Sequence, residues 1–385
     1  MKNQIQYISQ RCPFDEFYYR TMLDCIEYVP LDSLIYYIWA EPLSNLKSML
    51  DGLNYNSPNV FLFIPDNLSD NNFIVGQNLA SYGVQLIIDI AANHPRTNFV
   101  LISDVANLHL EGNSINNLKY VDSNLLTMEQ SQFQQIPINI KKNFNSDRHV
   151  LTLNNRASTS RISLLSYLLG NNMEQYGVLT VSELITNKVN QVDNYLNVSN
   201  WKFNLDHELE IKPKLNAGFQ KLKKYKYASD QTNNYYRHLV HSDNFTQYIS
   251  LLCYNSFVEI ITESYYEEPS LFVTEKTLQS ILGCNFPIII GSCGSIDYLE
   301  QLGFDMFRDI VDHRYDEIID PVDRLVTAVD LNHRLLTDGK WAKDAWISCQ
   351  SRFLRNVEFS KKDMYTVIYN RVITQFKAAC ISIDD

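Results

Sequence analysis

The 385-residue sequence has no long hydrophobic run and no recognisable cysteine framework. Apolar runs such as residues 286–290 are far shorter than the roughly 20 residues of a membrane-spanning helix, so we predict no such helix. The first residues lack both the apolar core and the cleavage site of a secretory signal peptide. Seven cysteines without a C-x-x-C pair argue against a zinc cluster and favour reduced thiols, so we expect a cytoplasmic protein.

Positive charge is also scarce in this chain. Lys and Arg total 33 against 44 Asp and Glu, which gives a net charge of −11. Such a chain repels a polyanion at long range, so a nucleic-acid partner would require a local basic patch. With 45% hydrophobic and 20% charged residues, the composition is that of a folded globular protein.

Strand-like and helix-like patterns alternate along most of the chain. The main predicted strands span 34–39, 60–64, 98–102, 149–153, 257–262 and 286–290, and predicted helices in the second half span 160–169, 275–282 and 296–302. A polar segment at 131–147 separates two such series. The pattern predicts an α/β fold with two Rossmann-like domains, 1–146 and 147–350, and helices in 351–385 that can cross back to the first domain.

One predicted helix begins with an unusual residue. Thr274 is a favourable N-cap, which places Glu275 and Lys276 in the first turn after it. A glutamate is favourable at the positive end of a helix, whereas a lysine is unfavourable there unless an anion such as phosphate is bound. Lys276 therefore indicates a phosphate ligand, and the alternative is a solvated lysine paired with Glu275 or Glu268.

The same region carries a recognisable motif, N-S-F…T-E…F-V-T-E-K-T…G-x-x-x-P-I-I-I-G, between Asn255 and Gly291. It resembles the donor-binding signature of glycosyltransferases of the GT-B fold, specifically the fucosyltransferase-like group. The chain also resembles glycosyltransferase-like proteins encoded by tailed phages, through Gly291-Ser-Cys-Gly-Ser, His313-Arg-Tyr-Asp316 and Asp323-Arg324. The resemblance covers residues 248–324, with a looser match at 151–169.

The resemblance implies a GT-B enzyme whose N-terminal domain binds the acceptor and whose C-terminal domain binds a nucleoside-diphosphate sugar. The donor is then a substrate, and no separate cofactor is expected. No Asp-x-Asp triplet follows a predicted strand in the setting of a metal site, so we expect a metal-independent reaction with Lys and Arg at the diphosphate. If the protein is phage-encoded, its compartment is the cytoplasm of the infected host cell.

The resemblance also assigns donor-binding residues. It implies that Glu275 accepts hydrogen bonds from the ribose hydroxyls, that Lys276 reaches the diphosphate, and that Arg161 holds phosphate at the start of the first helix of its domain. Arg156 competes with Arg161 for that role, and ordinary surface charge is the alternative for both. Asn255 and Ser256 would line the same cleft, and Glu263 at the end of its strand could contact the sugar; each could equally be a strand-end polar group satisfied by the backbone. The remaining candidates are the N-cap Thr274 and Gly291, whose loop allows close backbone approach.

A catalytic base is expected from the N-terminal domain if the reaction inverts configuration. Three carboxylates follow predicted strands there, where α/β proteins collect functional groups: Glu41, Asp66 and Asp104. Each could instead be a helix N-cap or a solvated loop residue. A retaining reaction would not need a single base.

The one basic and aromatic cluster of the chain is a candidate nucleic-acid contact. It comprises Lys221, Lys223, Lys224, Tyr225 and Lys226. Together with the phage resemblance it suggests a hydroxymethylated pyrimidine of phage DNA as the acceptor, flipped out of the duplex. The net negative charge argues against DNA, and a surface glycan, a small molecule, or a non-catalytic nucleotide- or glycan-binding role are the alternatives.

Overall fold

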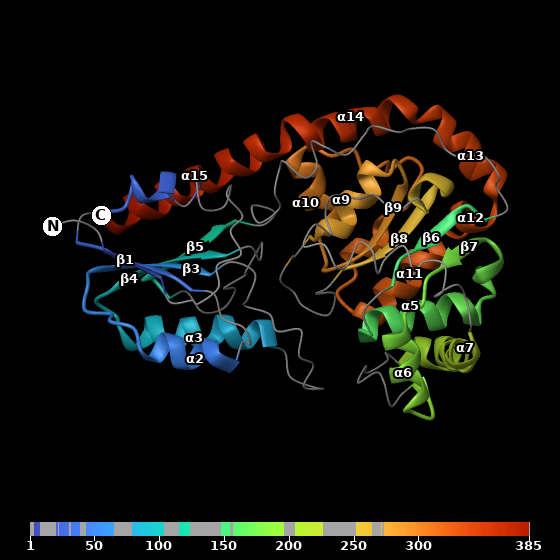
Figure 1. The fold of residues 1–385 in the computed structure, drawn as a ribbon, viewed down its shortest axis with the longest axis horizontal. Coiled ribbons are helices and arrows are strands. Elements are labelled where there is room, and N and C mark those ends of the chain that lie inside the picture. Colours follow the sequence, from blue (N-terminus) through green and yellow to red (C-terminus); the bar gives the residue numbers. More distant parts are fainter. Residues whose placement is uncertain are drawn as a thin grey trace. The chain divides into compact units, whose positions relative to one another are not determined.

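The structure is a computed structural model. It describes residues 4–7, 21, 23–30, 32–38, 44–64, 79–103, 115–123, 148–154, 157–195, 205–225, 252–263, 271 and 273–384. Contacts divide the chain into two compact units, the first formed by Met1–Gln130, Glu268–Val273 and Asp363–Asp385 and the second by Ser131–Glu267 and Thr274–Lys362 (Figure 1). The predicted domain limits of 1–146, 147–350 and 351–385 stay a prediction.

The first unit contains a parallel sheet whose strands follow the order of the chain. The strands are β1 (Gln4–Tyr7), β2 (Leu34–Tyr37), β3 (Asn59–Ile64), β4 (Asn98–Ser103) and β5 (Leu118–Asp122). Helices α2 (Ser44–Asp51) and α3 (Leu79–Asn93) connect successive strands. Because each connection steps in the same direction and parallel crossovers are right-handed, both helices lie on one face of the sheet.

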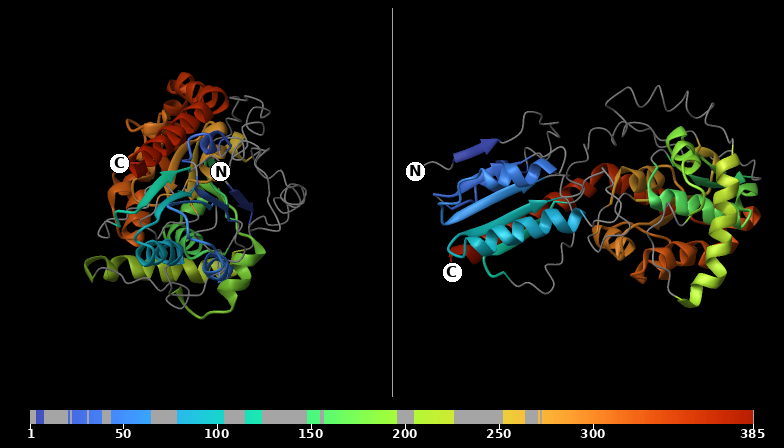
Figure 2. Two further views of the ribbon diagram at one scale, coloured as in Figure 1. Left: turned by 90° about the vertical axis from the view of Figure 1, so that its left-hand side faces the viewer. Right: turned by 90° about the horizontal axis from the view of Figure 1, so that it is seen from below.

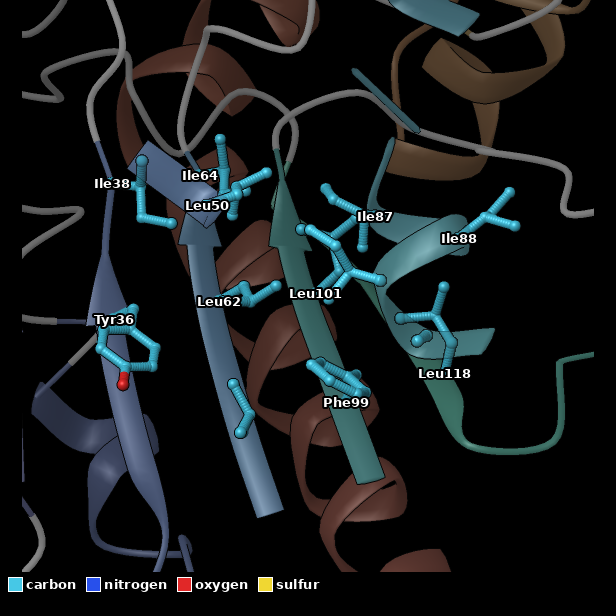
Figure 3. Close-up of a cluster of buried hydrophobic side chains, with 13 residues drawn as sticks. Tyr36, Ile38, Leu50, Leu62, Ile64, Ile87, Ile88, Phe99, Leu101 and Leu118 are labelled. Carbon is cyan, nitrogen blue, oxygen red and sulfur yellow. The ribbon is translucent and has the colours of Figure 1, made fainter. Parts of the chain in front are cut away.

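Strand β3 shows how both faces of this sheet are covered. Val60, Leu62 and Ile64 are fully buried in a cluster with residues of α2 and α3 (Figure 3). Phe61 and Phe63 alternate with them and point to the opposite face. There their rings lie 5.5 and 6.2 Å from that of Phe376 on α15 (Met364–Asp384).

Helix α15 therefore completes the first unit, although it is the last element of the chain (Figure 1 and Figure 2). Polar contacts fix it at the end of β5. The Asp122 backbone N–H donates to Gln375 Oε1 at 2.9 Å, and Arg371 pairs with the Asp122 carboxylate at 3.3 Å. The Tyr369 hydroxyl also donates to Asp24 at 2.8 Å.

The second unit contains a parallel sheet with the strand order β7-β6-β8-β9. The strands are β6 (Val150–Thr152), β7 (Gly177–Leu179), β8 (Val258–Thr262) and β9 (Phe286–Ile290). The chain moves from β6 to one side to form β7 and then returns past β6 to form β8. The order thus reverses between β6 and β8, and in open α/β sheets ligands bind outside the carboxyl ends of the strands at such a switch point.

Helices follow each strand of the second sheet. They are α5 (Thr159–Gly170), α6 (Glu183–Asn190), α7 (Leu205–Lys224), α9 (Glu275–Leu282), α10 (Ser295–Leu302), α11 (Pro321–Leu331), α12 (His333–Thr337), α13 (Gly339–Ser348) and α14 (Gln350–Lys362). Helix α7 crosses α5 so closely that a Cβ on Gly218 would lie 1.7 Å from the Ser166 carbonyl oxygen. Only glycine fits at that crossing.

The outer edge of β9 is covered by the segment after α10. The Ile289 N–H donates to the Tyr315 hydroxyl oxygen at 2.9 Å, and that hydroxyl lies 3.2 Å from His313 Nδ1. His313 Nε2 lies 2.7 Å from the Met306 carbonyl oxygen, so Nε2 carries the proton and Nδ1 accepts from Tyr315. Burial lowers the pKa of His313 to about 4, which keeps the ring neutral.

The α/β class, the parallel sheets and the helical C-terminal region agree with the sequence prediction. In the described residues, no helix has the length and apolar character needed to span a bilayer.

Candidate functional site

The start of α5 joins the two strands that flank the switch point. Ser158 is the N-cap, and its hydroxyl accepts from the Arg161 backbone N–H at 3.4 Å. Arg161 is 4% exposed, and its Nε donates to the hydroxyl of Thr262, the last residue of β8, at 3.3 Å. The first turn of α5 contains no acidic residue. A buried cation at a helix N-terminus therefore lies where this sheet is expected to bind a ligand.

Glu263 follows β8 and is 1% exposed. Both of its carboxylate oxygens accept from the start of α9. Oε1 accepts from the Thr274 backbone N–H at 3.0 Å and from the Thr277 hydroxyl at 2.7 Å, and Oε2 accepts from the Thr274 hydroxyl. Glu263 thereby ties the first turn of α9 to the carboxyl end of β8.

Thr274 caps α9 as the sequence predicts, because its hydroxyl oxygen accepts from the Lys276 backbone N–H. The half-buried Lys276 side chain returns to the same oxygen, with Nζ donating to Thr274 Oγ1 at 3.0 Å. The ammonium group is thus held at the first turn of its own helix. We call Arg161, Thr262, Glu263, Thr274, Lys276 and Gly291 the switch-point site.

Gly291 follows β9 and packs tightly against its neighbours in this site. A Cβ at this position would lie 3.0 Å from Ser295 Oγ and 3.4 Å from Glu263 Cβ and Cγ. A side chain at residue 291 would therefore be crowded by the Ser295 hydroxyl and would lie in contact with Glu263, so the end of β9 passes close to both residues.

Helix α10 begins with Gly294, which has a φ of 84° and no side chain to cap the helix. Asp316 supplies the cap from a distant part of the chain, since its Oδ2 accepts from the Ile296 N–H at 2.9 Å. Its backbone oxygen also accepts from the Gly294 N–H at 3.1 Å. Burial raises the pKa of Asp316 to about 6, while nearby Arg324 acts in the opposite direction.

The helices that follow β6, β8 and β9 therefore differ in charge at their N-termini. Buried carboxylates lie at two of them, Glu263 at α9 and Asp316 at α10. Such a carboxylate offsets part of the positive charge at the end of its helix, although at α9 the Lys276 ammonium group adds positive charge to the same turn. Helix α5 instead has a neutral cap and the buried Arg161. Among these three helices, the start of α5 is the best place for a phosphate group.

The structure brings together Arg161, Thr274, Lys276, Glu263 and Gly291 of the predicted donor residues. Glu275 is the first residue of α9, but its side chain lies outside the described residues. Five other candidates also lie outside them: Arg156, Glu41, Asp66, Asp104 and Lys226. Their assigned roles stay predictions.

Asn255 and Ser256 are not part of this group. They precede β8, in and after the 3-10 turn Cys253–Asn255, and so lie at the amino end of the strand. The Ser256 hydroxyl donates to the Leu252 carbonyl oxygen at 3.1 Å and lies 3.4 Å from Asn285 Oδ1, just before β9. The expectation that both residues line the donor site needs correction, because parallel strands place them at the opposite edge of the sheet.

Most of the predicted basic cluster lies at the end of α7. Lys221 Nζ donates to the Leu169 carbonyl oxygen at 2.9 Å and to Asn172 Oδ1 at 2.5 Å, which satisfies the C-terminal end of α5. Lys223 Nζ donates to the Asp193 carbonyl oxygen at 3.4 Å, whereas Lys224 is exposed and Tyr225 is half-buried. Two of the lysines thus have structural partners, and a nucleic-acid role for the cluster stays a prediction.

Sequence reasoning missed the contributions of Thr277 and Asp316. Asp316 belongs to the His313-Arg-Tyr-Asp316 motif, so the signal was present without a role attached to it. In the first unit it also missed Asp122, a 7%-exposed carboxylate at the carboxyl end of β5. Its strand is short and was not predicted.

Across the described residues, no group of three or more His, Cys, Asp and Glu side chains has an arrangement that could hold a metal ion. No protein-family model, curated protein or solved structure matches the chain.

Proposed function

We propose that this protein is a metal-independent glycosyltransferase that moves a sugar from a nucleoside-diphosphate sugar to a hydroxyl acceptor. The observation that carries the proposal is the start of α5, where buried Arg161 bonds to the end of β8 at the switch point. A helix N-terminus and a guanidinium together suit a diphosphate. The step from diphosphate binding to sugar transfer rests on the resemblance of the 248–324 segment to GT-B enzymes.

In this proposal each cation stabilises the leaving group. Bond cleavage at the anomeric carbon leaves negative charge on the nucleoside diphosphate, and fixed positive groups lower the free energy of that state. Arg161 and the N–H groups of α5 would face one phosphate. Lys276, held by Thr274, would face the diphosphate from α9, and Glu275 would bind the ribose hydroxyls.

The acceptor half of the reaction is proposed on the resemblance alone. The two units would have the GT-B arrangement, with the acceptor on the first unit and Glu41, Asp66 or Asp104 as the base. A hydroxymethylated pyrimidine of phage DNA is the proposed acceptor, and a glycan or small molecule is the alternative. Asp122 is not proposed as the base, because its carboxylate is paired with Arg371 at 3.3 Å.

A thermal-shift panel of uridine, guanosine, thymidine, cytidine and adenosine diphosphates tests the donor site. At 100 times its Kd a ligand stabilises the folded protein by about 2.7 kcal/mol, which the method resolves. We expect a selective shift with one nucleotide that Arg161→Lys weakens, because lysine keeps the charge but loses the planar fork of donors. No shift with any nucleotide contradicts the proposal.

A second assay separates an enzyme from a binding protein. Radiolabelled sugar conjugates of the selected nucleotide would be incubated with hydroxymethylated DNA, glycans or water, and release of the nucleoside diphosphate measured. We expect release that depends on an acceptor. Tight nucleotide binding without release under any condition would instead support a non-catalytic binding protein.

A further inference from the structure

Glu263 is poorly placed to contact a sugar directly. Its side chain is 1% exposed, and both carboxylate oxygens already accept hydrogen bonds from α9. It contacts two threonines of that helix, and only one of them, Thr274, also holds the Lys276 ammonium group.

We propose that Glu263 is a positioning residue that acts through the Thr274 hydroxyl to hold the Lys276 ammonium group toward the bound diphosphate. The inference rests on the proposed function, because it assumes that the switch-point site binds a diphosphate. It assigns to Glu263 a different role from the sugar contact predicted from the sequence.

The hydrogen-bond capacity of Thr274 carries the argument. A threonine hydroxyl has one proton and two lone pairs. The proton goes to Glu263 Oε2, so the oxygen faces Lys276 as an acceptor, where it receives the backbone N–H at 3.4 Å and Nζ at 3.0 Å. Without the carboxylate the hydroxyl proton could rotate toward Lys276, and the oxygen would lose its fixed orientation.

Burial makes this arrangement rigid. Glu263, Thr274 and Thr277 are each at most 4% exposed, so water does not compete for their hydrogen bonds. Glu263 also lies beside Gly291, where an added Cβ would be 3.4 Å from its Cβ and Cγ. A flexible lysine is thereby confined before any ligand arrives, which lowers the entropy lost on binding.

Double-mutant cycles on the full-length protein test this role, with the Kd of inorganic pyrophosphate and of the selected nucleoside diphosphate measured by calorimetry. We expect Glu263→Gln and Thr274→Val each to weaken binding about three- to tenfold, or about 0.7 to 1.4 kcal/mol. Thr274→Ser keeps the hydroxyl and restores binding. Both losses disappear in a Lys276→Ala background, because the only effect of the relay is exerted through that lysine.

Thr277→Val is the matched control. It removes one hydrogen bond to Glu263 but leaves the link from Thr274 to Lys276 intact, so it should lower the free energy of unfolding while leaving the Kd unchanged. Equal losses of affinity in Thr277→Val and Thr274→Val overturn the proposal. So does a Thr274→Val effect that persists in the Lys276→Ala background.

The measurements also distinguish this inference from the proposed function. If neither pyrophosphate nor any nucleotide binds the wild-type protein, the proposed function fails and this role fails with it. If the ligands bind and Lys276→Ala weakens binding while Glu263→Gln does not, only the positioning role of Glu263 is overturned.

Discussion

The two sheets of this protein are both parallel, but only the second reverses its strand order. In the first sheet the strands lie in the order of the chain, so its connecting helices α2 and α3 share one face and α15 covers the other. In the second sheet the order β7-β6-β8-β9 opens a switch point between β6 and β8. Buried Arg161 and Glu263 lie at the carboxyl end of β8 beside this switch point. The buried carboxylate of the first sheet, Asp122, lies instead at the end of the last strand and pairs with Arg371 of α15. Strand order thus decides which strand ends bring charged side chains of several elements together.

The first sheet instead depends on the end of the chain for its stability. Phe376 is fully buried against Phe61 and Phe63. We expect Phe376→Ala to lower the free energy of unfolding of the first unit by about 3 to 5 kcal/mol. Urea unfolding with hydrogen exchange at β3 would measure it. Ile381→Ala on the same helix is the control, since Ile381 is 65% exposed and its loss should change stability by less than about 0.5 kcal/mol.

The same substitution tests whether α15 stabilises the first sheet independently of the second. If Phe376→Ala left β3 as protected from exchange as in the wild type, α15 would not complete the first unit. Equal loss of protection in β8 would mean that the two units do not unfold separately. We expect loss in β3 alone.

In the second unit, substitution of Lys276 should reduce function rather than stability. We expect Lys276→Ala to reduce sugar transfer by about 10² or more, because it removes a fixed positive group from the leaving diphosphate. Lys340→Ala is the matched control: it is also a lysine in the first turn of a helix, α13, and it is exposed. Steady-state kinetics would compare them, and transfer within a few-fold of wild type in Lys276→Ala would remove that residue from the mechanism.

Two buried groups near β9, Asp316 and His313, change the stability of the second unit in opposite directions as the pH changes. Burial raises the pKa of Asp316 from 3.8 to about 6, so the native state binds the proton more tightly and stability is lost as pH rises through this window. Burial lowers the pKa of His313 from 6.5 to about 4, so the unfolded state binds the proton more tightly and stability is lost as pH falls. Between about pH 4 and 6 the two effects oppose each other.

Asp316→Asn separates these effects. The variant lacks the loss that ionisation of Asp316 causes, so its stability relative to the wild type should rise by about 2 to 3 kcal/mol between pH 4 and pH 7. Urea unfolding at several pH values would measure this difference. A difference that stays constant with pH would show that Asp316 is not held with a raised pKa in the native state.

The sequence indicated much of this site because its main signals are local. The strand patterns at 257–262 and 286–290 and the N-cap at Thr274 were predicted and are present. Three strands were not predicted, because β1 (Gln4–Tyr7) and β5 (Leu118–Asp122) interrupt their apolar residues with polar ones and β7 (Gly177–Leu179) contains only two apolar side chains after a glycine. Helix α7 was not predicted either, since Pro213 lies in its interior and proline normally ends a helix.

Contacts between distant residues could not be predicted from such local patterns. The hydrogen bonds of Glu263 to Thr274 and Thr277 depend on how the chain returns after β8. The remote capping of α10 by Asp316 spans 20 residues. Asn255 and Ser256 were assigned to the donor site by the resemblance alone, although they precede the predicted strand 257–262 and therefore lie at its amino end.

The two ends of α5 carry basic residues with different expected roles. Lys221 satisfies the C-terminal end of α5 through the Leu169 carbonyl oxygen, while Arg161 lies at its N-terminal end. We expect Lys221→Ala to lower the free energy of unfolding by about 0.5 to 1.5 kcal/mol without changing the Kd for a nucleoside diphosphate. Lys224→Ala, at an exposed position of the same helical turn, should leave stability nearly unchanged. If both variants instead weakened binding to hydroxymethylated DNA equally, with no change in stability, the end of α7 would be a nucleic-acid surface, and the contacts of Lys221 within the unit would be of minor energetic importance.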